Sequence, residues 1–362
     1  MIGATLGRYL SWRFFSTIML VFLTICGMVY VVDFVELLRR AANRPGVTAS
    51  FVALLSFLRT PSVAEQILPF CVLFGTMQAF IDLTRRLELI VARAAGVSVW
   101  QFLVPPIGIA LFIGILSVAV LNPMSAEMKQ RADIFENEIF GSSSGQTAGD
   151  SALWIRQTSV DGQAYLHADK SAKGGVELTG VQAYLYDPKG EFLEKVTAES
   201  ARLQPGVWQL KNAVVAAPGD PPEKVSTYLI ASKVTPNNLA ETFLTAESVP
   251  FWSLQKMGKE ASEAGLDSTG FTLQYQTLLA RPLLLVAMVL IAAAFSLRFF
   301  RFGGIGKMVG SGLGAGFALY LLTKMIADLG ASGLLSVPVA AWSPAIVGSM
   351  LGALALLQRE DG

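Results

Sequence analysis

Reactive and metal-binding side chains are scarce in this chain. Its 362 residues include one histidine and two cysteines, and only 15% of them are charged. The histidine, His167, lies in a strand-like stretch with no cysteine or second histidine to share a metal ion, so we expect it to be structural or at the surface. Cys26 and Cys71 fall inside apolar runs, where buried thiols are common. The sequence therefore predicts no metal site and no disulfide framework.

A nucleotide-binding motif is lacking as well. Gly303–Lys307 resembles a phosphate-binding loop, but Arg301 stands where the first glycine belongs and Met308 replaces the serine or threonine. Basic and acidic residues are balanced, 28 against 27, so no overall field indicates a nucleic-acid partner. We therefore expect a chain that is not an enzyme and binds no cofactor, and any energy that it uses must come from a partner.

What the chain has in abundance is apolar sequence, at 53% of its residues. A helix needs about 20 predominantly apolar residues to cross a bilayer. The first run is too long for the apolar region of a signal peptide, and no small-residue cleavage site follows it, so we expect it to be an uncleaved span. The predicted spans are Phe14–Val32, Ser62–Ile81, Phe102–Leu121, Leu278–Leu297, Met308–Leu322 (extended toward Ala327) and Val337–Leu357.

The insertion between the third and fourth spans has a different character. Turn-forming sequences such as Asp187–Gly190 and Gln204–Gly206 separate short alternating stretches rich in β-branched and aromatic residues. This pattern predicts one antiparallel β domain, either a sandwich, a jelly roll or an open barrel. The expected strands include Ala152–Arg156, Ala164–Ala168, Val181–Tyr186, Phe192–Ala198, Val207–Leu210 and Ser226–Ile230, and Pro250–Leu266 is expected to form a short helix that leads back to the membrane.

The fold class predicted is an α-helical integral membrane protein with six transmembrane helices and an inserted all-β, jelly-roll-like domain between helices three and four. We expect transmembrane helices one to three within 1–122, the β domain and its linkers within 123–270, and helices four to six within 271–362. Short loops on the side of the termini hold nine basic residues, and the short loop on the other side holds four. Positive residues favour the cytoplasmic side, so the termini are predicted to be cytoplasmic, although counting the flanks of the β domain leaves nine against eight.

The loop between the second and third spans contains a helical pattern within 84–98. Leu87, Ile90, Val91 and Ala94 recur at the spacing of one helix face, and Gly96 is expected to end the helix. Arg86 and Arg93 share another face. The pattern fits an interfacial helix resting on lipid headgroups, and it fits equally a coupling helix that docks in a groove of a cytoplasmic motor protein.

A family resemblance enters at this loop. Glu88–Ser98 resembles the Glu-Leu-x-x-x-x-Ala-x-Gly segment of the LptF/LptG permeases, the membrane part of the ABC transporter that exports lipopolysaccharide. The resemblance covers nearly the whole chain, and Ala95–Ser98 and Phe317–Tyr320 are more similar to the LptG branch than to the LptF branch. Other matching stretches, in order, are Arg8-Tyr9, Phe34–Glu36 with Arg39-Arg40, Leu68-Pro69, Asn122-Pro123, Arg281-Pro282 and Phe300-Arg301.

The resemblance implies partners and a task. Such a subunit pairs with an LptF-like six-span subunit, and two copies of an LptB-like ATPase bind the coupling helices, with Glu88 as the acidic residue that engages the ATPase. An LptC-like single-span protein joins the complex, and an LptA-like bridge receives the lipid. The β domain is then periplasmic, and the protein extracts lipopolysaccharide from the inner membrane for assembly of the outer membrane.

The resemblance also suggests sites for lipid and for the sister subunit. Four arginines stand on the outer side of the first spans, where basic residues are disfavoured, and guanidinium groups pair well with phosphates. They fit simple interfacial anchors equally well. The substrate-binding candidates are Asp33, Glu36, Arg39, Arg40, Arg44 and Lys324, with Lys324 and Asp328 expected to form an intrahelical pair.

The fifth span carries glycines four residues apart, which allow close helix packing. Gly306, Gly310 and Gly314 are candidates for the interface with the sister subunit, and packing within this chain is the alternative. Other functions stay open at this point. The chain could be the LptF-type paralogue, or a membrane scaffold or sensor that binds lipid without transporting it. A membrane-embedded lipid enzyme is disfavoured because no His/Glu/Asp zinc cluster is present.

Overall fold

The computed structural model describes residues 4–42, 47–140, 153–159, 162–172, 176–187, 191–219, 221–232, 246–263, 268–297 and 305–360. The chain divides into two compact units, one formed by Met1–Ala132 with Leu273–Gly362 and the other by Asp133–Thr272. Both boundaries fall inside helices, because the helices at Asn122–Phe140 and Thr269–Ser296 each continue from one unit into the other.

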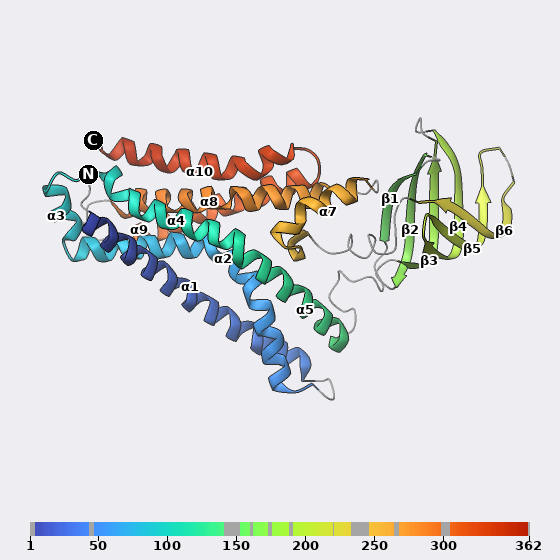
Figure 1. Ribbon diagram of the computed structural model, residues 1–362, viewed down its shortest axis with the longest axis horizontal. Coiled ribbons are helices and arrows are strands. Elements are labelled where there is room, and N and C mark those ends of the chain that lie inside the picture. The colour runs from blue at the N-terminus through green and yellow to red at the C-terminus, as the bar shows by residue number, and fades with distance from the viewer. Residues whose placement is uncertain are drawn as a thin grey trace. The chain divides into compact units, whose positions relative to one another are not determined.

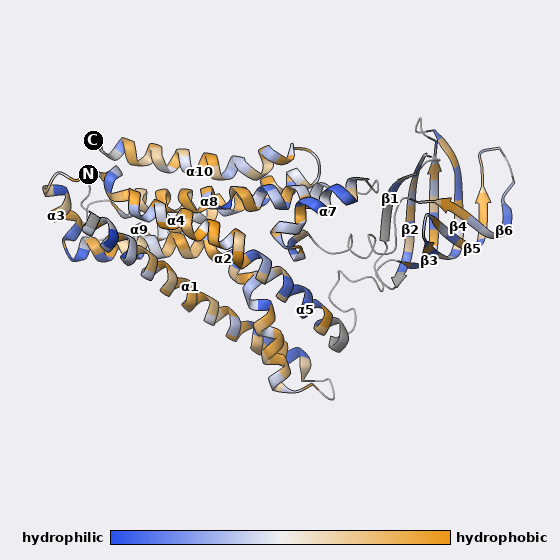
Figure 2. Cartoon of the chain, viewed as in Figure 1, coloured by the Kyte–Doolittle hydropathy of each residue, from blue (hydrophilic) through white to orange (hydrophobic). Residues whose placement is uncertain are grey.

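Six helices among the described residues are long and apolar enough to cross a membrane, which confirms the predicted six-span fold. Apolar residues line α1 along its length in Figure 2. The helices reach beyond the predicted apolar runs: α1 has 38 residues, which corresponds to about 57 Å against about 30 Å of hydrocarbon. The spans are α1 (Ala4–Ala41), α2 (Ala49–Arg85), α4 (Val99–Leu116) with η1 (Ser117–Leu121) and α5 (Asn122–Phe140), α8 (Thr269–Ser296), α9 (Ile305–Ala331) and α10 (Val337–Glu360).

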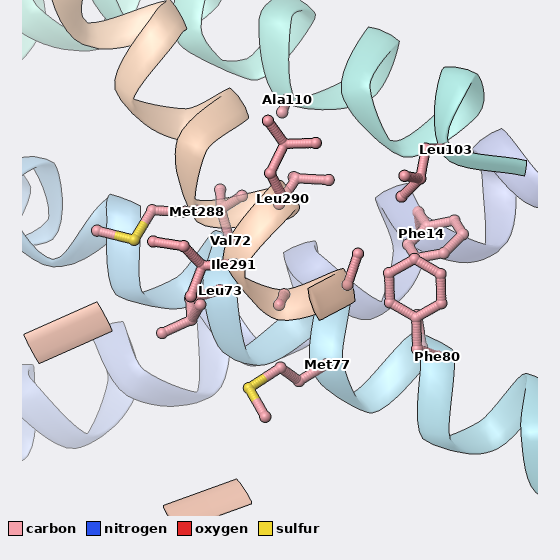
Figure 3. Close-up of a cluster of buried hydrophobic side chains, with 14 of the residues drawn as sticks. Phe14, Val72, Leu73, Met77, Phe80, Leu103, Ala110, Met288, Leu290 and Ile291 are labelled. Carbon is pink, nitrogen blue, oxygen red and sulfur yellow. The ribbon is translucent and has the colours of Figure 1, made fainter. Parts of the chain in front are cut away.

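A large apolar core joins helices of the first unit. Phe14 of α1 meets Phe80 of α2 edge to face, with ring centroids 5.0 Å apart, and Phe80 lies 6.0 Å from Phe102 of α4. Figure 3 shows Phe14, Phe80 and Leu103 gathered from three helices around this contact. The central part of α8 supplies a continuous run of buried residues from Leu285 to Ala294. Packing of this kind fixes the helices that carry the loop between α2 and α4.

The second unit contains a six-stranded antiparallel sheet in the order β1-β2-β3-β4-β5-β6. Each predicted strand segment overlaps an observed strand, so the inserted all-β domain is confirmed. Among the described strands the sheet is an antiparallel meander, in which each strand pairs with the next one along the chain. The strands are β1 (Leu153–Ser159), β2 (Gly162–Ala172), β3 (Glu177–Tyr186), β4 (Phe192–Gln204), β5 (Val207–Ala216) and β6 (Glu223–Ala231), followed by η2 (Ala246–Ser248) and the predicted short helix α7 (Phe251–Glu263).

The sheet curls so that its two edge strands approach each other. The buried Gln157 of β1 donates to the carbonyl oxygen of Ala231 in β6 at 3.3 Å. Its side-chain oxygen accepts hydrogen bonds from Trp208 at 3.3 Å and from Ser232 at 2.8 Å. One face of the sheet is thereby enclosed, with Leu166, Trp208 and other apolar residues fully buried on it. Of the predicted architectures, an open, curled barrel describes these strands best.

Candidate functional site

The predicted coupling segment forms α3 (Glu88–Ala94), a shorter helix than the 84–98 stretch that was expected. The chain breaks after α2 because Leu87 adopts a left-handed backbone with φ of 61°. Gly96, at φ of 83°, ends α3 as predicted, and the N–H of Val97 bonds back to the carbonyl of Ala92 at 3.2 Å. Arg86 caps the end of α2 and therefore lies outside α3, whereas Arg93 is in its last turn.

The apolar stripe of this segment faces away from the rest of the chain. Leu87 is 58% exposed, Ile90 45% and Val91 66%, and Ala94 is exposed as well. Leu89 points the other way, is 8% exposed and belongs to the main core. Sequence reasoning missed Leu89, because both faces of so short a helix are apolar and the periodicity favoured the other set. The structure thus leaves the predicted stripe available to a partner.

The inner side of α3 rests on the ends of two spans. Leu89 and Ala92 of α3 line a small hollow together with Phe102 of α4 and Leu297, which follows α8. Through these residues α3 packs on the ends of the spans and is part of the helical core rather than an isolated loop.

A second connection runs from α3 to α1. The hydroxyl of Tyr9 donates to the two carboxylate oxygens of Glu88 at 3.0 and 3.3 Å. Tyr9 is 44% exposed, so this contact lies at the surface beside the apolar stripe. In the sequence, Tyr9 was noted only as part of the Arg8-Tyr9 stretch that matches the family, and no sequence pattern predicted its contact with Glu88. Glu88 is therefore oriented by its own chain.

The acidic and basic candidates at the far end of α1 are brought together by the helix. Glu36 accepts hydrogen bonds from Nε and Nη2 of Arg39, both at 3.0 Å, and from Nε of Arg40 at 3.0 Å. The side chains of Arg39 and Arg40 remain 76% and 53% exposed. Asp33 faces Arg59 of α2 at 3.8 Å. The resulting cluster holds exposed guanidinium groups that are already shared with a carboxylate.

Two candidates remain. Arg44 lies outside the residues that the structure describes. Lys324 is exposed on α9, and among the described side chains no ion pair joins it to Asp328, so the expected intrahelical pair is absent. Within the same described part of the chain, no group of His, Cys, Asp or Glu could hold a metal ion.

The glycines of α9 separate into two rows with different surroundings. A Cβ placed on Gly312 would lie 2.6 Å from Met77, and one on Gly316 would lie 2.3 Å from Leu73, so this row packs tightly on α2. A Cβ on Gly306, Gly310 or Gly314 would meet nothing within 4 Å. Internal packing therefore uses one row, and the row predicted for the subunit interface is open.

Comparison with known proteins places these features in a family. The family model described as lipopolysaccharide export system permease LptF/LptG matches residues 8–359. The chain is 22% identical over 331 residues to the lipopolysaccharide export system permease protein LptG of Escherichia coli (strain K12), covering 90% of each chain. It is 23% identical over 342 residues to the protein of the same name from Haemophilus influenzae, covering 89% of each. The chain therefore belongs to the LptF/LptG family of lipopolysaccharide export permeases, as a multi-pass transport subunit of the inner membrane.

Proposed function

We propose that this chain is the LptG-type subunit of the exporter, and that it extracts lipopolysaccharide from the inner membrane under the power of a separate ATPase. The observation that carries this proposal is the exposed apolar stripe of Leu87, Ile90 and Val91 beside Glu88. A scaffold or sensor needs no such docking surface. Both relatives described above bear the LptG name, which favours LptG over the LptF-type alternative.

The ATPase contact combines apolar burial with one charge. Exposed side chains of the stripe lose contact with water when a groove covers them, which favours docking. Glu88 adds a charge-assisted hydrogen bond to a basic group of the ATPase, and such a bond is stronger than one between neutral groups. We expect an LptB-like dimer, of which one copy binds this chain and the other binds an LptF-like subunit. This chain itself binds no cofactor.

The proposed orientation places the termini and α3 in the cytoplasm and the β domain in the periplasm. There the curled sheet receives lipid and passes it toward an LptA-like bridge, with an LptC-like single-span protein in the same complex. The buried face of the sheet is apolar, as an acyl-chain surface must be.

Arg39 and Arg40 are proposed to contact the phosphates of the lipid headgroup. Their exposed guanidinium groups support this role, and Glu36 holds them in position until a phosphate competes for them. The open glycines Gly306, Gly310 and Gly314 are proposed to pack against the LptF-like subunit.

Purification of the tagged chain from its own host tests the whole proposal. We expect an ATPase, a second six-span subunit and lipopolysaccharide to accompany it in defined ratio. Complementation separates the two branches, because an LptG-type chain restores export in cells depleted of LptG and fails in cells depleted of LptF. Recovery of the chain without an ATPase would leave the scaffold function instead.

A further inference from the structure

A buried polar cluster joins three spans of the helical unit. The carboxylate of Glu65 in α2 accepts hydrogen bonds from Asn122 at 2.9 Å, from Ser125 at 2.6 Å and from Nη1 of Arg281 in α8. The same guanidinium nitrogen reaches Ser117 of η1 at 3.4 Å. Glu65 is 7% exposed, Asn122 and Ser125 are 1% and 2% exposed, and 14% of the Arg281 side chain is exposed.

Each span that contributes to the cluster is irregular at that level. Glu65 lies midway between Pro61 and Pro69, which are both inside the continuous helix α2. Asn122 precedes Pro123, and the π-helical turn η1 comes directly before it. Arg281 precedes Pro282 inside α8. Proline removes a backbone donor and clashes with the preceding turn, and π turns loosen a helix, so bending is concentrated here.

The helices on one side of the cluster are closely packed. A Cβ on Gly114 of α4 would lie 2.5 Å from the Cα of Pro282 in α8, so the two backbones are in close contact. On this side the main core contains Leu68 and later residues of α2, and α1 residues no further along the chain than Phe22.

On the other side α1 and α2 form a separate pair of helices. We define the distal hairpin as residues 30–41 of α1 and 49–60 of α2. Ser56 donates to the carbonyl of Tyr30 at 3.2 Å, and Arg59 faces Asp33 at 3.8 Å. Leu37 and Leu55 are each 1% exposed, yet neither belongs to the main core. Figure 1 shows this hairpin diverging from α8 and α10.

We infer that the Glu65–Arg281 pair is the pivot about which the distal hairpin changes its angle to α8. The pair fixes α2 to α5 and α8 at one point, the prolines and η1 permit bending there, and the hairpin beyond is held by its own contacts. Glu65 and Arg281 are positioning residues, since they set where α1 and α2 can move. The pivot is inferred from the contacts of these residues alone, and only its role in transport rests on the proposed function.

The physical chemistry of buried ion pairs allows a sharp test. Removing one member leaves an uncompensated buried charge, which destabilises the fold, but replacing both by apolar residues of similar size is often neutral for stability. The double variant Glu65→Met/Arg281→Met therefore removes the pivot without requiring that the protein unfold. Spin labels at Phe57 and Leu279, both exposed, measure the angle of the hairpin to α8. Labels at the exposed Gln78 and Val104 report on the packed side as a matched control.

The distances are measured by pulsed electron–electron double resonance. The sample is the full chain in nanodiscs, with Cys26 and Cys71 replaced by alanine and without lipopolysaccharide or nucleotide. We expect the double variant to keep its thermal unfolding midpoint within a few degrees and to broaden the Phe57–Leu279 distribution at least twofold, while Gln78–Val104 stays unchanged. Unchanged distributions at both pairs, or broadening at both, would overturn the pivot.

A milder variant covers the case in which the double variant does not fold. Ser125→Ala removes one donor to Glu65 but keeps the Glu65–Arg281 pair, so it leaves no buried charge unpaired. It should therefore broaden the Phe57–Leu279 distribution to a smaller extent. No broadening in that variant counts against the pivot. Lipopolysaccharide release by the reconstituted complex, expected to fall severalfold, is a second readout. The distance data stand without it, so failure of the pivot and failure of the transport function are distinguishable.

Discussion

The hydroxyl of Tyr9 lies 3.0 Å from a carboxylate oxygen of Glu88, and this contact joins the beginning of α1 to the short helix α3. The two residues are separated by the whole of α2 in the chain. If an ATPase docks on α3 as proposed, α1 is in direct contact with the docking helix through this hydrogen bond, in addition to the contact of Leu89 with the core.

Tyr9→Phe removes this hydrogen bond and leaves the ring in place. We expect the affinity for the ATPase to fall by up to about fivefold, because one hydrogen bond contributes about 1 kcal/mol. Microscale thermophoresis of the ATPase with the purified chain measures this affinity. Trp12→Phe, which alters another exposed aromatic residue of α1, is the control and should bind normally. Equal losses in the two variants would show that Tyr9 does not orient Glu88.

Glu88→Ala should weaken ATPase docking more than the loss of Tyr9 does, by about 1–3 kcal/mol, while the chain remains folded. Glu88→Gln separates charge from geometry, because the amide oxygen still accepts from Tyr9 but carries no charge. Pull-down yield and export in cells measure both variants. Wild-type pull-down with normal export in Glu88→Ala would leave α3 as an interfacial helix.

The two glycine rows of α9 predict opposite outcomes for the same substitution. Gly310→Leu places a side chain in open space, so the isolated chain should fold normally but lose its LptF-like partner on co-purification. Gly316→Leu clashes with Leu73 and should cost about 1–3 kcal/mol in the free energy of unfolding. Thermal unfolding and subunit recovery are measured on both. Normal subunit recovery with Gly310→Leu would remove this row from the interface.

Arg39→Ala/Arg40→Ala should lower the amount of lipopolysaccharide that co-purifies, without loss of insertion or subunit assembly. Replacement of both by lysine should be milder, because charge is kept and only the planar guanidinium geometry is lost. Glu36→Gln frees both arginines and should raise lipid occupancy. Normal occupancy in the double alanine variant would identify these arginines as interfacial anchors.

Gln157→Leu should open the curled sheet at its edges. The substitution removes the acceptor of the buried Trp208 and Ser232 side chains, and the unpaired Trp208 N–H alone costs about 1–3 kcal/mol. Hydrogen exchange should accelerate in β1 and β6 while the central strands stay protected. Gln204→Leu, at an exposed position of β4, is the control. Unchanged exchange at both edges would mean that Gln157 does not hold them together.

The architecture followed from local pattern. Apolar runs of membrane length determined the six spans, and alternation between turn signals determined the six strands, because both patterns arise from neighbours in sequence. For the same reason the sequence predicted the apolar stripe of Leu87, Ile90 and Val91 and the end of α3 at Gly96. Helix ends were predicted less accurately. The helix α3 is short because Leu87 has a left-handed backbone, a conformation that leucine rarely adopts and that no local sequence pattern predicts.

Long-range pairings were decided only by the tertiary structure. Tyr9 with Glu88, Gln157 with Ala231, and Glu65 with Asn122 and Arg281 join segments far apart in the chain, and no periodicity links such positions. The two glycine rows of α9 have the same spacing, yet one packs on α2 and the other faces outward. The type of a residue determines which interactions its side chain can make. Which neighbour it contacts is determined by the packing of all the helices and strands together, because protein interiors are closely packed.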